Sequence, residues 1–455
     1  MKCFNRKRNS AGRGLLIPGL LMALLVLATV GSVCADGNYA VWMGCVSGTN
    51  GNITNIVSGG SAYVGICSDK TIISSPDGTS WSAAYTATDV PTDMVYCGGK
   101  FYGCAGSSFI TSSDGTAWTS TTFHGPNPNY AYTINGITYG VGGEMVAGGY
   151  STILCSSDYG ITWVPLYLGA MQSYFGKMTY LPATDQFVGL GTGGQIVKIS
   201  KTVDGSGNVI FNYTPIASSQ TMYFTGLSYN PYPQTWYGII VDNIHDYWIS
   251  ASKDLYIWNH IDSGKGDING FYFNNGMSFG MGSVMGSMPT VDTSGAWSHQ
   301  NLNLSNAVIN DIAYGDSTYI AVGNNGVVFS SRNGTTWTAC SSGTTKNLIK
   351  VLFIGGSGTP KKLSKAVSSC GAFVAVGANG TIITANSATS INNSRRIEHA
   401  QTNWSHDARN VPLHAYSING RELKSFYRCP ALQRPATVLL REQSRNGTSG
   451  VVVWH

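Results

Sequence analysis

Arginine and glutamate are almost missing from the long middle of this 455-residue chain. Arg332 is the single arginine between residues 36 and 394, and Glu144 is the single glutamate between residues 36 and 391. Arginine holds carboxylates and phosphates through paired hydrogen bonds, so a site built on several arginines is excluded from this region. A catalytic pair of two glutamates is excluded there as well.

Charged residues of either sign are scarce, at 11% of the chain, and they are unevenly placed. Residues 1–35 carry five basic and no acidic side chains, residues 36–391 carry thirteen basic and eighteen acidic, and residues 392–455 carry nine and four. The largest region is therefore mildly acidic, although the net charge of the chain is +5. Since a nucleic-acid binder shows a basic footprint, we expect no nucleic acid among the partners.

Signatures of several catalytic and cofactor sites are also missing. The chain has no nucleophile elbow, phosphate-binding loop, metalloprotease His-Glu motif or paired Cys-x-x-Cys motif. We therefore expect neither a cofactor nor a metal. Four methionines close together in the chain could hold Cu(I), but methionine equally fills gaps beside glycine, and we prefer that interpretation. They are Met277, Met281, Met285 and Met288.

Long apolar runs are confined to the N-terminus. Residues 1–35 combine basic side chains with an apolar stretch from Leu15 to Val30 and small residues before Asp36, the pattern of a secretory signal peptide cleaved before Asp36. A lipid anchor on Cys34 is the alternative. No later stretch reaches the roughly 18 apolar residues that a membrane helix needs. We expect a bacterial protein that is secreted or lies at the cell surface, without a transmembrane span in its mature chain.

Cysteine is present, with eight residues after the signal segment, and export would permit disulfides. Spacing does not decide the pairing, because eight cysteines allow on the order of a hundred combinations. Cys97 and Cys104 flank one short turn, and Cys340 and Cys370 bracket one connection, so these are the preferred pairs. Packed free thiols are the alternative.

Glycine is abundant, with 57 residues, and it belongs to a repeated pattern. From about residue 53 to residue 384, an apolar strand ending in an aromatic residue, a Gly-rich turn and an apolar run ending at Gly recur about every 37 to 50 residues. With helical patterns almost absent, this repeat predicts an all-β fold with a single eight-bladed β-propeller, seven blades being the alternative. The strand-ending aromatics are Tyr96, Tyr139, Tyr180, Tyr229, Phe273, Tyr314 and Phe353, and Ser58 is the one departure.

The last unit of the repeat lacks an outer strand that carries tryptophan. Residues 40–45 resemble such a strand, because Trp42 precedes Cys45 by the same spacing that separates Trp337 from Cys340. We therefore predict one propeller over residues 36–391, in which the first strand completes the last blade.

The composition changes after about residue 385, where the glycine repeat stops and arginine becomes common. Serine, asparagine and threonine lead into a linker that we place at residues 392–410. Residues 411–455 are predicted to form a small β-sandwich-like domain with a hairpin at Asn419-Gly420.

Four turns of the repeat share a motif. Residues 156–163 read Ser-Ser-Asp-Tyr-Gly-Ile-Thr-Trp, and shorter copies end in Trp81, Trp118 and Trp337. The motif resembles the Asp-box (BNR) hairpin, so residues 36–391 resemble Asp-box propellers, which include sialidases, xyloglucan-cleaving hydrolases and photosystem II assembly-factor-like proteins. This resemblance implies the fold and says little about function. A sialidase holds its substrate with three arginines, which this region lacks.

In such a turn the aspartate accepts backbone N–H hydrogen bonds and the tryptophan wedges between blades. The resemblance therefore implies structural rather than catalytic roles. The residues concerned are Asp77, Trp81, Asp114, Trp118, Asp158, Trp163, Asn333 and Trp337.

The segment from Tyr416 to Lys424 resembles the first part of type IX secretion sorting domains, which carry an Asn/Asp-Gly-Arg turn and then an apolar-Lys pair. Residues 436–441 replace the later strand of that family but lack its Gly and Tyr. The resemblance implies that type IX-like secretion machinery is a partner. A plain immunoglobulin-like accessory domain is the alternative.

The fifth unit departs most from the repeat, and departures from a repeat are where sites are commonly built. It carries a carboxylate, a histidine and aromatic side chains that could bind a sugar or a metal, with an irregular solvated turn as the alternative. The candidate ligand-binding residues are Asp242, His245, Asp246, Tyr247, Trp248, Tyr256 and Trp258.

The predicted function is a non-catalytic binding scaffold for a glycan or a cell-envelope protein. A ring of blades presents loops on two faces, and 25 tyrosines with 11 tryptophans suit such contacts. A polysaccharide hydrolase that uses a pair of aspartates is the rival hypothesis. An extracytoplasmic assembly factor is a third, implied by the resemblance alone. The hydrolase would draw on Asp242, Asp246, Asp254 or Asp262.

Overall fold

The computed structural model describes the greater part of the repeat region and three strands near the C-terminus. The described residues are 39, 41–125, 132–166, 168, 173–216, 224–231, 234–240, 247–274, 276–289, 297–300, 302, 307–355, 372–386, 426–427, 439–443 and 449–453. The chain divides into two units, Met1–Arg396 and Ile397–His455.

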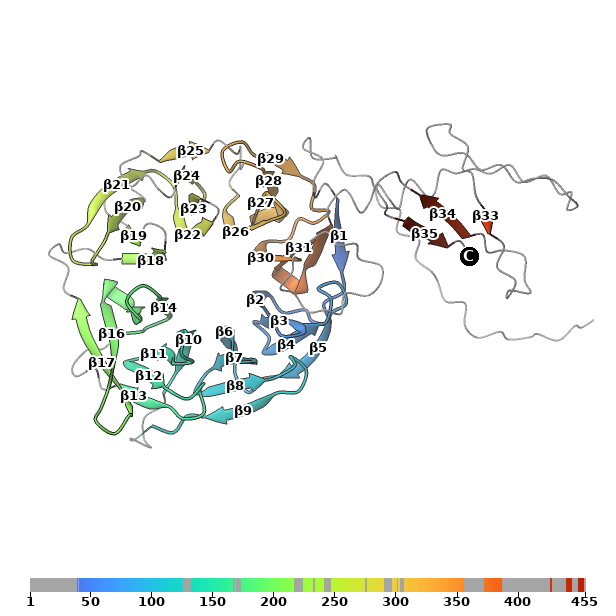
Figure 1. Ribbon diagram of the computed structural model, residues 1–455. Helices are drawn as coiled ribbons and strands as arrows, with labels where there is room; N and C mark the ends of the chain where they lie inside the picture. The colour runs from blue at the N-terminus through green and yellow to red at the C-terminus, as the bar shows by residue number, and fades with distance from the viewer. Residues whose placement is uncertain are drawn as a thin grey trace, which may run out of the picture. The chain divides into compact units, whose positions relative to one another are not determined.

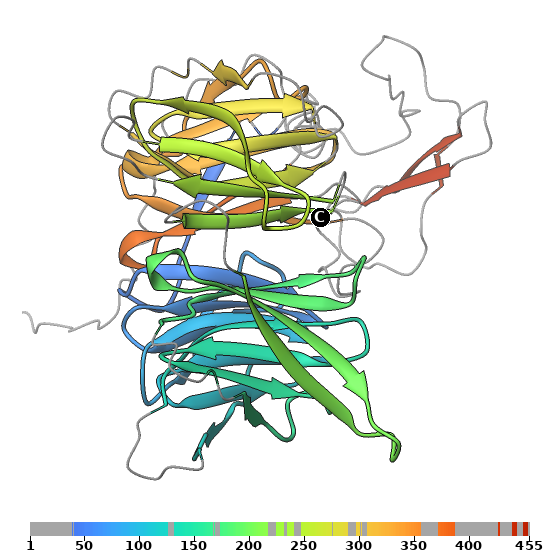
Figure 2. The same cartoon turned by 90° about the vertical axis from the view of Figure 1, so that its left-hand side faces the viewer.

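The first unit is a ring of eight four-stranded antiparallel sheets around an open centre, as Figures 1 and 2 show. We number these sheets blade 1 to blade 8 in chain order. The predicted all-β propeller with eight blades is therefore confirmed, and the seven-bladed alternative is wrong.

The strands of blades 1 to 4 run from the inside of the ring to the outside. Blade 1 holds β2 (Ile53–Gly59), β3 (Ala62–Cys67), β4 (Thr71–Ser75) and β5 (Ser82–Thr86). Blade 2 holds β6 (Pro91–Cys97), β7 (Lys100–Ala105), β8 (Ser108–Ser112) and β9 (Thr119–Thr122). Blade 3 holds β10 (Ile134–Tyr139), β11 (Met145–Gly149), β12 (Thr152–Ser156) and β13 (Val164–Leu166). Blade 4 holds β14 (Lys177–Leu181), β15 (Gln186–Leu190), β16 (Ile196–Val203) and β17 (Val209–Ile216).

Blades 5 to 8 follow the same order. Blade 5 holds β18 (Phe224–Asn230), β19 (Thr235–Ile240), β20 (Tyr247–Ser252) and β21 (Asn259–Gly264). Blade 6 holds β22 (Ile268–Asn274), β23 (Met277–Gly282), β24 (Met285–Pro289) and β25 (Ser298–Gln300). Blade 7 holds β26 (Ile309–Gly315), β27 (Thr318–Gly323), β28 (Val328–Ser331) and β29 (Thr338–Cys340). Blade 8 holds β30 (Leu348–Ile354), β31 (Ala372–Gly377), β32 (Ile382–Asn386) and β1 (Trp42–Cys45). Among the residues that the structure describes, three short 3-10 helices lie in turns: η1 (Thr192–Gly194), η2 (Asn324–Gly326) and η3 (Ala378–Gly380).

The core lies between the blades. The second strand of several blades is buried along its whole length, as in β3, β19, β27 and β31. Such a strand is apolar on both faces and needs a cover on each side. Neighbouring blades provide it. Val64 of blade 1 and Phe101 of blade 2, for example, belong to one cluster, and Val146 of blade 3 and Phe187 of blade 4 belong to another.

The last blade joins two distant parts of the chain. β1 pairs antiparallel with β32, with Trp42 opposite Ala385. Nearby, the ring of Tyr39 packs edge-on against Phe373 at 4.7 Å, and its hydroxyl donates a hydrogen bond to Asp316 Oδ2 at 2.7 Å. The first strand of the described chain therefore completes the sheet formed by its last strands.

Each of the four motif turns is held by hydrogen bonds of its own. In blade 1, Asp77 Oδ1 accepts from the N–H groups of Thr79 and Ser80 at 2.8 and 2.7 Å, and Trp81 Nε1 donates to Gly78 O at 2.9 Å. The same contacts recur around Asp114 and Asn333 and their tryptophans. The turn at Asp158 is one residue longer: its carboxylate accepts from the N–H of Thr162, and Trp163 Nε1 donates to Gly160 O. Gly78 has a φ of 75°, a conformation in which a side chain is strained.

Blade 5 contains a fifth turn of this kind that the sequence motif does not reveal. Asp254 Oδ1 accepts from the N–H groups of Tyr256 and Ile257 at 2.8 and 2.9 Å, and Trp258 Nε1 donates to Leu255 O at 2.9 Å. Leu255 takes the place of glycine and has a φ of 74°. The turn is therefore the same, although its most diagnostic residue is different.

The preferred disulfide between Cys97 and Cys104 is wrong, since both are buried free thiols. In the β6–β7 pair Cys97 lies opposite Lys100 and Cys104 lies opposite Asp93. The two cysteines are thus four residues out of register, about 13 Å at roughly 3.3 Å per residue, which is too far for a bridge. Cys340 is disulfide-bonded. Cys370, its preferred partner, lies outside the described residues.

In the second unit, β33 (Phe426–Tyr427), β34 (Leu439–Gln443) and β35 (Ser449–Val453) form a three-stranded sheet in that order. The signal segment 1–35, the linker 392–410 and the Asn419-Gly420 hairpin lie outside the described residues. Within the described ranges, no helix has the length and apolar character needed to cross a membrane.

Candidate binding site in the central channel

Three of the predicted ligand-binding residues, Asp242, His245 and Asp246, lie outside the described residues. Tyr247 is buried in β20, and its hydroxyl donates to Asp262 Oδ2 at 3.2 Å. Burial, together with the charge of that carboxylate, raises the pKa of Tyr247 well above its usual value.

The remaining predicted residues lie in different surroundings. Trp258 is buried in the fifth turn, and Tyr256 is 39% exposed with Lys198 Nζ 6.0 Å from its ring centre. Trp248 Nε1 donates to Ser250 Oγ at 3.0 Å. Trp258 and Tyr247 belong to separate core clusters on the two faces of blade 5. The described candidates therefore do not converge on one point.

The four methionines of blade 6 do not all lie on one side of the blade, since Met277, Met281 and Met285 share one core cluster and Met288 belongs to another. Met285 packs in the core between blades 6 and 7, whereas Met288 packs in the core between blades 5 and 6. Within the part of the chain that the structure describes, no group of three or more His, Cys, Asp or Glu residues could hold a metal ion.

A polar cluster ties blades 3 and 4 together. Lys201 contacts the carboxylate of Glu144, and its Nζ lies 2.8 Å from Asp185 Oδ2, whose other oxygen accepts from the Tyr180 hydroxyl at 2.9 Å. Burial acts against the charge on Lys201, but the hydrogen bonds to Asp185 and Glu144 outweigh it and raise the pKa of the lysine. Both carboxylates already have a cationic partner, so this cluster serves as a tie between blades.

A different set of side chains meets at the centre of the ring. Each inner strand carries one residue that directly precedes an apolar residue and lies three positions before the strand-ending aromatic or Ser58. In seven of the eight inner strands the register shifts immediately before this position. We call the eight residues at this position the ring residues. They are Asn55, Asp93, Gly136, Lys177, Gly226, Gly270, Asp311 and Lys350.

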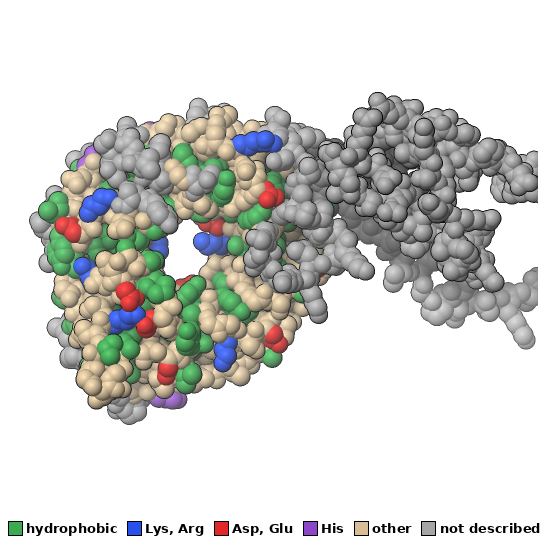
Figure 3. All heavy atoms as spheres, viewed as in Figure 1, with side chains coloured by type: hydrophobic (Ala, Val, Ile, Leu, Met, Phe, Trp, Pro, Cys, Tyr) green, Lys and Arg blue, Asp and Glu red, His purple; other side chains and the backbone are tan. Residues whose placement is uncertain are grey.

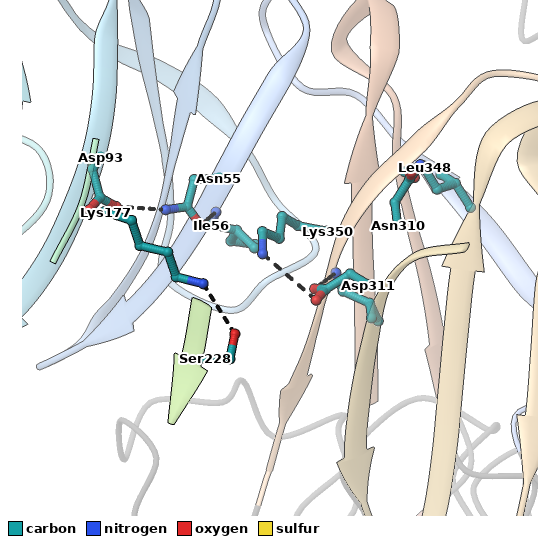
Figure 4. Close-up of polar contacts among 10 residues, drawn as sticks. Asn55, Ile56, Asp93, Lys177, Ser228, Asn310, Asp311, Leu348 and Lys350 are labelled. Atoms are coloured by element: carbon teal, nitrogen blue, oxygen red, sulfur yellow. Dashed lines mark hydrogen bonds and ion pairs between the residues drawn. The ribbon is translucent and has the colours of Figure 1, made fainter. Parts of the chain in front are cut away.

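The charged ring residues lie around an open channel. Figure 3 shows basic and acidic side chains at the wall of the central opening, and Figure 4 shows Asp93, Lys177, Asp311 and Lys350 directed toward it. They come from blades 2, 4, 7 and 8, so distant parts of the sequence supply them.

Asp93 and Asp311 each connect their own blade to the next blade of the ring. Asp93 Oδ2 accepts from the N–H of Ile137 in blade 3 at 3.1 Å, and its Oδ1 accepts from Met94 N–H at 2.9 Å. Asp311 Oδ2 likewise accepts from the N–H of Val351 in blade 8 at 3.0 Å. Burial raises the pKa of both carboxyls despite these hydrogen bonds. Their oxygens are engaged with backbone donors, so a structural role follows.

The two lysines differ in their partners. Lys350 Nζ lies 3.7 Å from Asp311 Oδ1. Lys177 Nζ donates to the neutral hydroxyl of Ser228 in blade 5 at 3.3 Å. Lys177 is exposed to water in the channel. The protein around the channel nevertheless removes part of its hydration, and this desolvation, together with the charge of Lys350, lowers the pKa of Lys177. The groups around Lys177 therefore compensate its positive charge only weakly.

Sequence reasoning missed this site because each blade contributes a single residue and no local motif forms. A signal was nevertheless present. Aligning the eight units on their strand-ending position places every ring residue in one column, and Lys177 and Lys350 then appear in a region that has few charges.

No protein-family model matches the chain, and no curated protein matches it. Solved structures are similar to it in fold. Sqt1 from Saccharomyces cerevisiae matches with a TM-score of 0.54 and 10% identity over 76% of this chain and 100% of that one. The computationally designed protein Ika8 matches with a TM-score of 0.52 and 11% identity over 75% and 98%. A structure described as YCF48 bound to D1 peptide matches with a TM-score of 0.46 and 13% identity over 76% and 96%. At such low identity, Sqt1 and Ika8 support the propeller fold alone.

Proposed function

We propose that this protein is a non-catalytic binding scaffold whose ligand, a glycan or a protein, engages the ring at its central channel. One observation carries the proposal: side chains from four separate blades meet at the channel, and among them Lys177 has only a neutral hydroxyl as its hydrogen-bond acceptor. A concave site with a few convergent polar groups is the usual form of a ligand site. The scarcity of charge elsewhere in the propeller favours a ligand that carries few charges.

The hydrolase hypothesis draws little support from the described aspartates. The carboxylate of Asp254 holds a turn, and that of Asp262 accepts from Tyr247 and lies 3.3 Å from His299 Nε2. A hydrolytic pair must have one carboxyl that can donate a proton and one that can activate water or attack. The assembly-factor hypothesis is a special case of the scaffold, in which the ligand is a protein complex.

We also propose that the chain is an exported member of the Asp-box propellers. The five turns built on Asp77, Asp114, Asp158, Asp254 and Asn333 support this, because each uses one side chain to hold the backbone of a hairpin. Export rests on the signal-like residues 1–35. Delivery by type IX-like machinery rests on the resemblance of residues 411–455.

The function is tested by binding the full-length chain to a glycan array, followed by a search for shortened sugars on the washed spots. A parallel capture from a cell-envelope fraction covers protein ligands. Binding that persists in Asp242→Asn and Asp246→Asn variants is the expected result. Shortened sugars would overturn the non-catalytic proposal, and failure to bind either class would overturn the scaffold itself.

Export is tested separately by deleting residues 392–455. If this segment is a sorting signal, the truncated protein accumulates in the periplasm. Normal delivery to the surface or the medium would remove the type IX proposal.

A further inference from the structure

The aspartates among the ring residues follow a simple rule. Each one accepts the N–H of the residue that follows the next blade's ring residue: Asp93 accepts from Ile137, and Asp311 accepts from Val351. An inner strand has no partner strand on its channel side, so every second N–H group on that edge must find another acceptor. In these two places a carboxylate of the preceding blade supplies it.

The same N–H in blade 5 belongs to Leu227. Leu227 follows the ring residue of blade 5 as Met94 follows that of blade 2. The two residues have the same register, because Leu227 lies opposite Gly238 and Met94 lies opposite Gly103. The preceding ring residue is Lys177, whose ammonium has no lone pair to accept a hydrogen bond. Among the residues that the structure describes, no side chain accepts from the N–H of Leu227. The equivalent N–H in blade 6 belongs to Phe271, and the ring residue of the preceding blade is Gly226, which has no side chain to accept it. Within the described ranges, no side chain accepts from this N–H either.

Hydrogen-bond donors therefore gather on this side of the channel without matching acceptors. Lys177 has three N–H bonds, of which one points to Ser228. The ring residues on either side of it, Gly136 and Gly226, have no side chain that could approach. Lys350, by contrast, has Asp311 as its partner.

We propose that the channel beside Lys177 binds the carboxylate of an acidic side chain from a partner polypeptide. This carboxylate takes the place between blades 4 and 5 that Asp93 takes between blades 2 and 3. It accepts from the N–H of Leu227 on one oxygen and from the ammonium of Lys177 on the other. The proposal rests on the proposed function and specifies its ligand. An aspartate or glutamate of a polypeptide is the expected source, because the chain's own aspartates already demonstrate the fit.

The electrostatics of the channel are consistent with one added negative charge. Burial and the charge of Lys350 lower the pKa of Lys177, and Asp93 is the carboxylate that offsets them. Asp93 itself is engaged with two backbone N–H groups and Asn55. A bound carboxylate would compensate Lys177 directly, and charge-assisted hydrogen bonds of this kind are about twice as strong as neutral ones.

The experiment uses the full-length chain labelled with ¹⁵N-leucine, with the amide of Leu227 as the reporter. The probe is N-acetyl-aspartate amide, which carries one side-chain carboxylate, and the matched neutral probe is N-acetyl-asparagine amide. At constant ionic strength the acidic probe is expected to shift the Leu227 amide saturably, and the neutral probe is not. The Lys177→Met variant should weaken binding of the acidic probe at least tenfold, whereas Lys177→Arg should retain it.

Lys100→Met, which removes an exposed lysine of blade 2, is the control and should bind the probe as the wild type does. Equal responses to the two probes, or an unchanged response in Lys177→Met, would overturn the proposal. Glucuronate binding in place of the acidic peptide probe would overturn the polypeptide source. A protein partner captured equally by wild type and Lys177→Met would leave the scaffold standing without this site. A response of Leu227 with no partner captured would support the carboxylate site and count against the scaffold.

Discussion

Leu255 sets backbone strain against burial in a single residue. It is 1% exposed and packs with Phe224 and Trp258, yet its φ of 74° is one that the other turns give to glycine. A side chain in this left-handed conformation costs about 1–2 kcal/mol. Truncating a buried leucine to alanine costs about 2–5 kcal/mol. The packing contribution is the larger of the two, which explains why leucine is tolerated.

Two substitutions separate these contributions. Leu255→Ala removes the packing and keeps the strain, so we expect a loss of about 2–5 kcal/mol in the free energy of unfolding. Leu255→Gly removes the packing and also the strain, so its loss should be smaller than that of the alanine variant by about 1 kcal/mol. At an ordinary position glycine would instead be the less stable of the two by roughly 0.5–1 kcal/mol.

Urea denaturation followed by tryptophan fluorescence measures the order of the three midpoints. The expected order is wild type, then glycine, then alanine. Gly334→Ala is the control at a glycine turn, where φ is 74° and an added Cβ would lie 2.8 Å from Phe279 Cζ. It should lower the midpoint. A glycine variant with a midpoint above wild type, or an alanine variant with a midpoint above the glycine variant, would refute this balance of strain and packing.

Three further predictions concern charge and thiols. Backbone N–H groups hold the pKa of Asp114 at about 2, so its contribution to stability is fully present above pH 3.8 and is lost as the pH falls from 3.8 through the folded pKa of about 2. Asp114→Asn, which copies the native Asn333 turn, should therefore flatten the acid side of a Tm–pH profile, and an unchanged slope would argue against it. Lys201→Met should lower the free energy of unfolding, measured in urea, by about 3 kcal/mol, because it leaves Glu144 buried without a cation, and adding Glu144→Gln should restore part of the loss. No recovery in the double variant would contradict this tie. Cys104, whose pKa burial raises, should react with a thiol reagent only after denaturant is added, and rapid labelling of the native chain would show that it is accessible.

Sequence reasoning reached the eight blades because each unit repeats one strand-ending residue and one Gly-rich turn. These features are set by the local backbone conformation, so a short stretch of sequence is enough to predict them. The fifth turn was not predicted from the sequence, because Leu255 replaces the expected glycine. Its backbone conformation is retained by packing against residues of other strands, which no local pattern contains.

The site in the channel was not predicted from the sequence for a related reason. Lys177 and Lys350 are 173 residues apart, and a single charged residue in a strand ordinarily reads as a solvated position. Only the register of eight strands shows that these residues share one level of the ring. The Cys97–Cys104 disulfide failed in the same way, since closeness in sequence does not set which residues of a hairpin lie opposite each other.

Closure of the ring by β1 and β32 also sets an order of events during synthesis. Cys45 and Thr384, whose side chains lie 3.7 Å apart in blade 8, are separated by 339 positions. At about 5–20 residues per second, a ribosome adds this length of chain in tens of seconds. For all that time β1 has no strand beside it, so blades 1 to 7 are in place before the circle can close. Chains that stop short of β32 would expose β1 and the final blade as two free edges, each open to pairing with another chain.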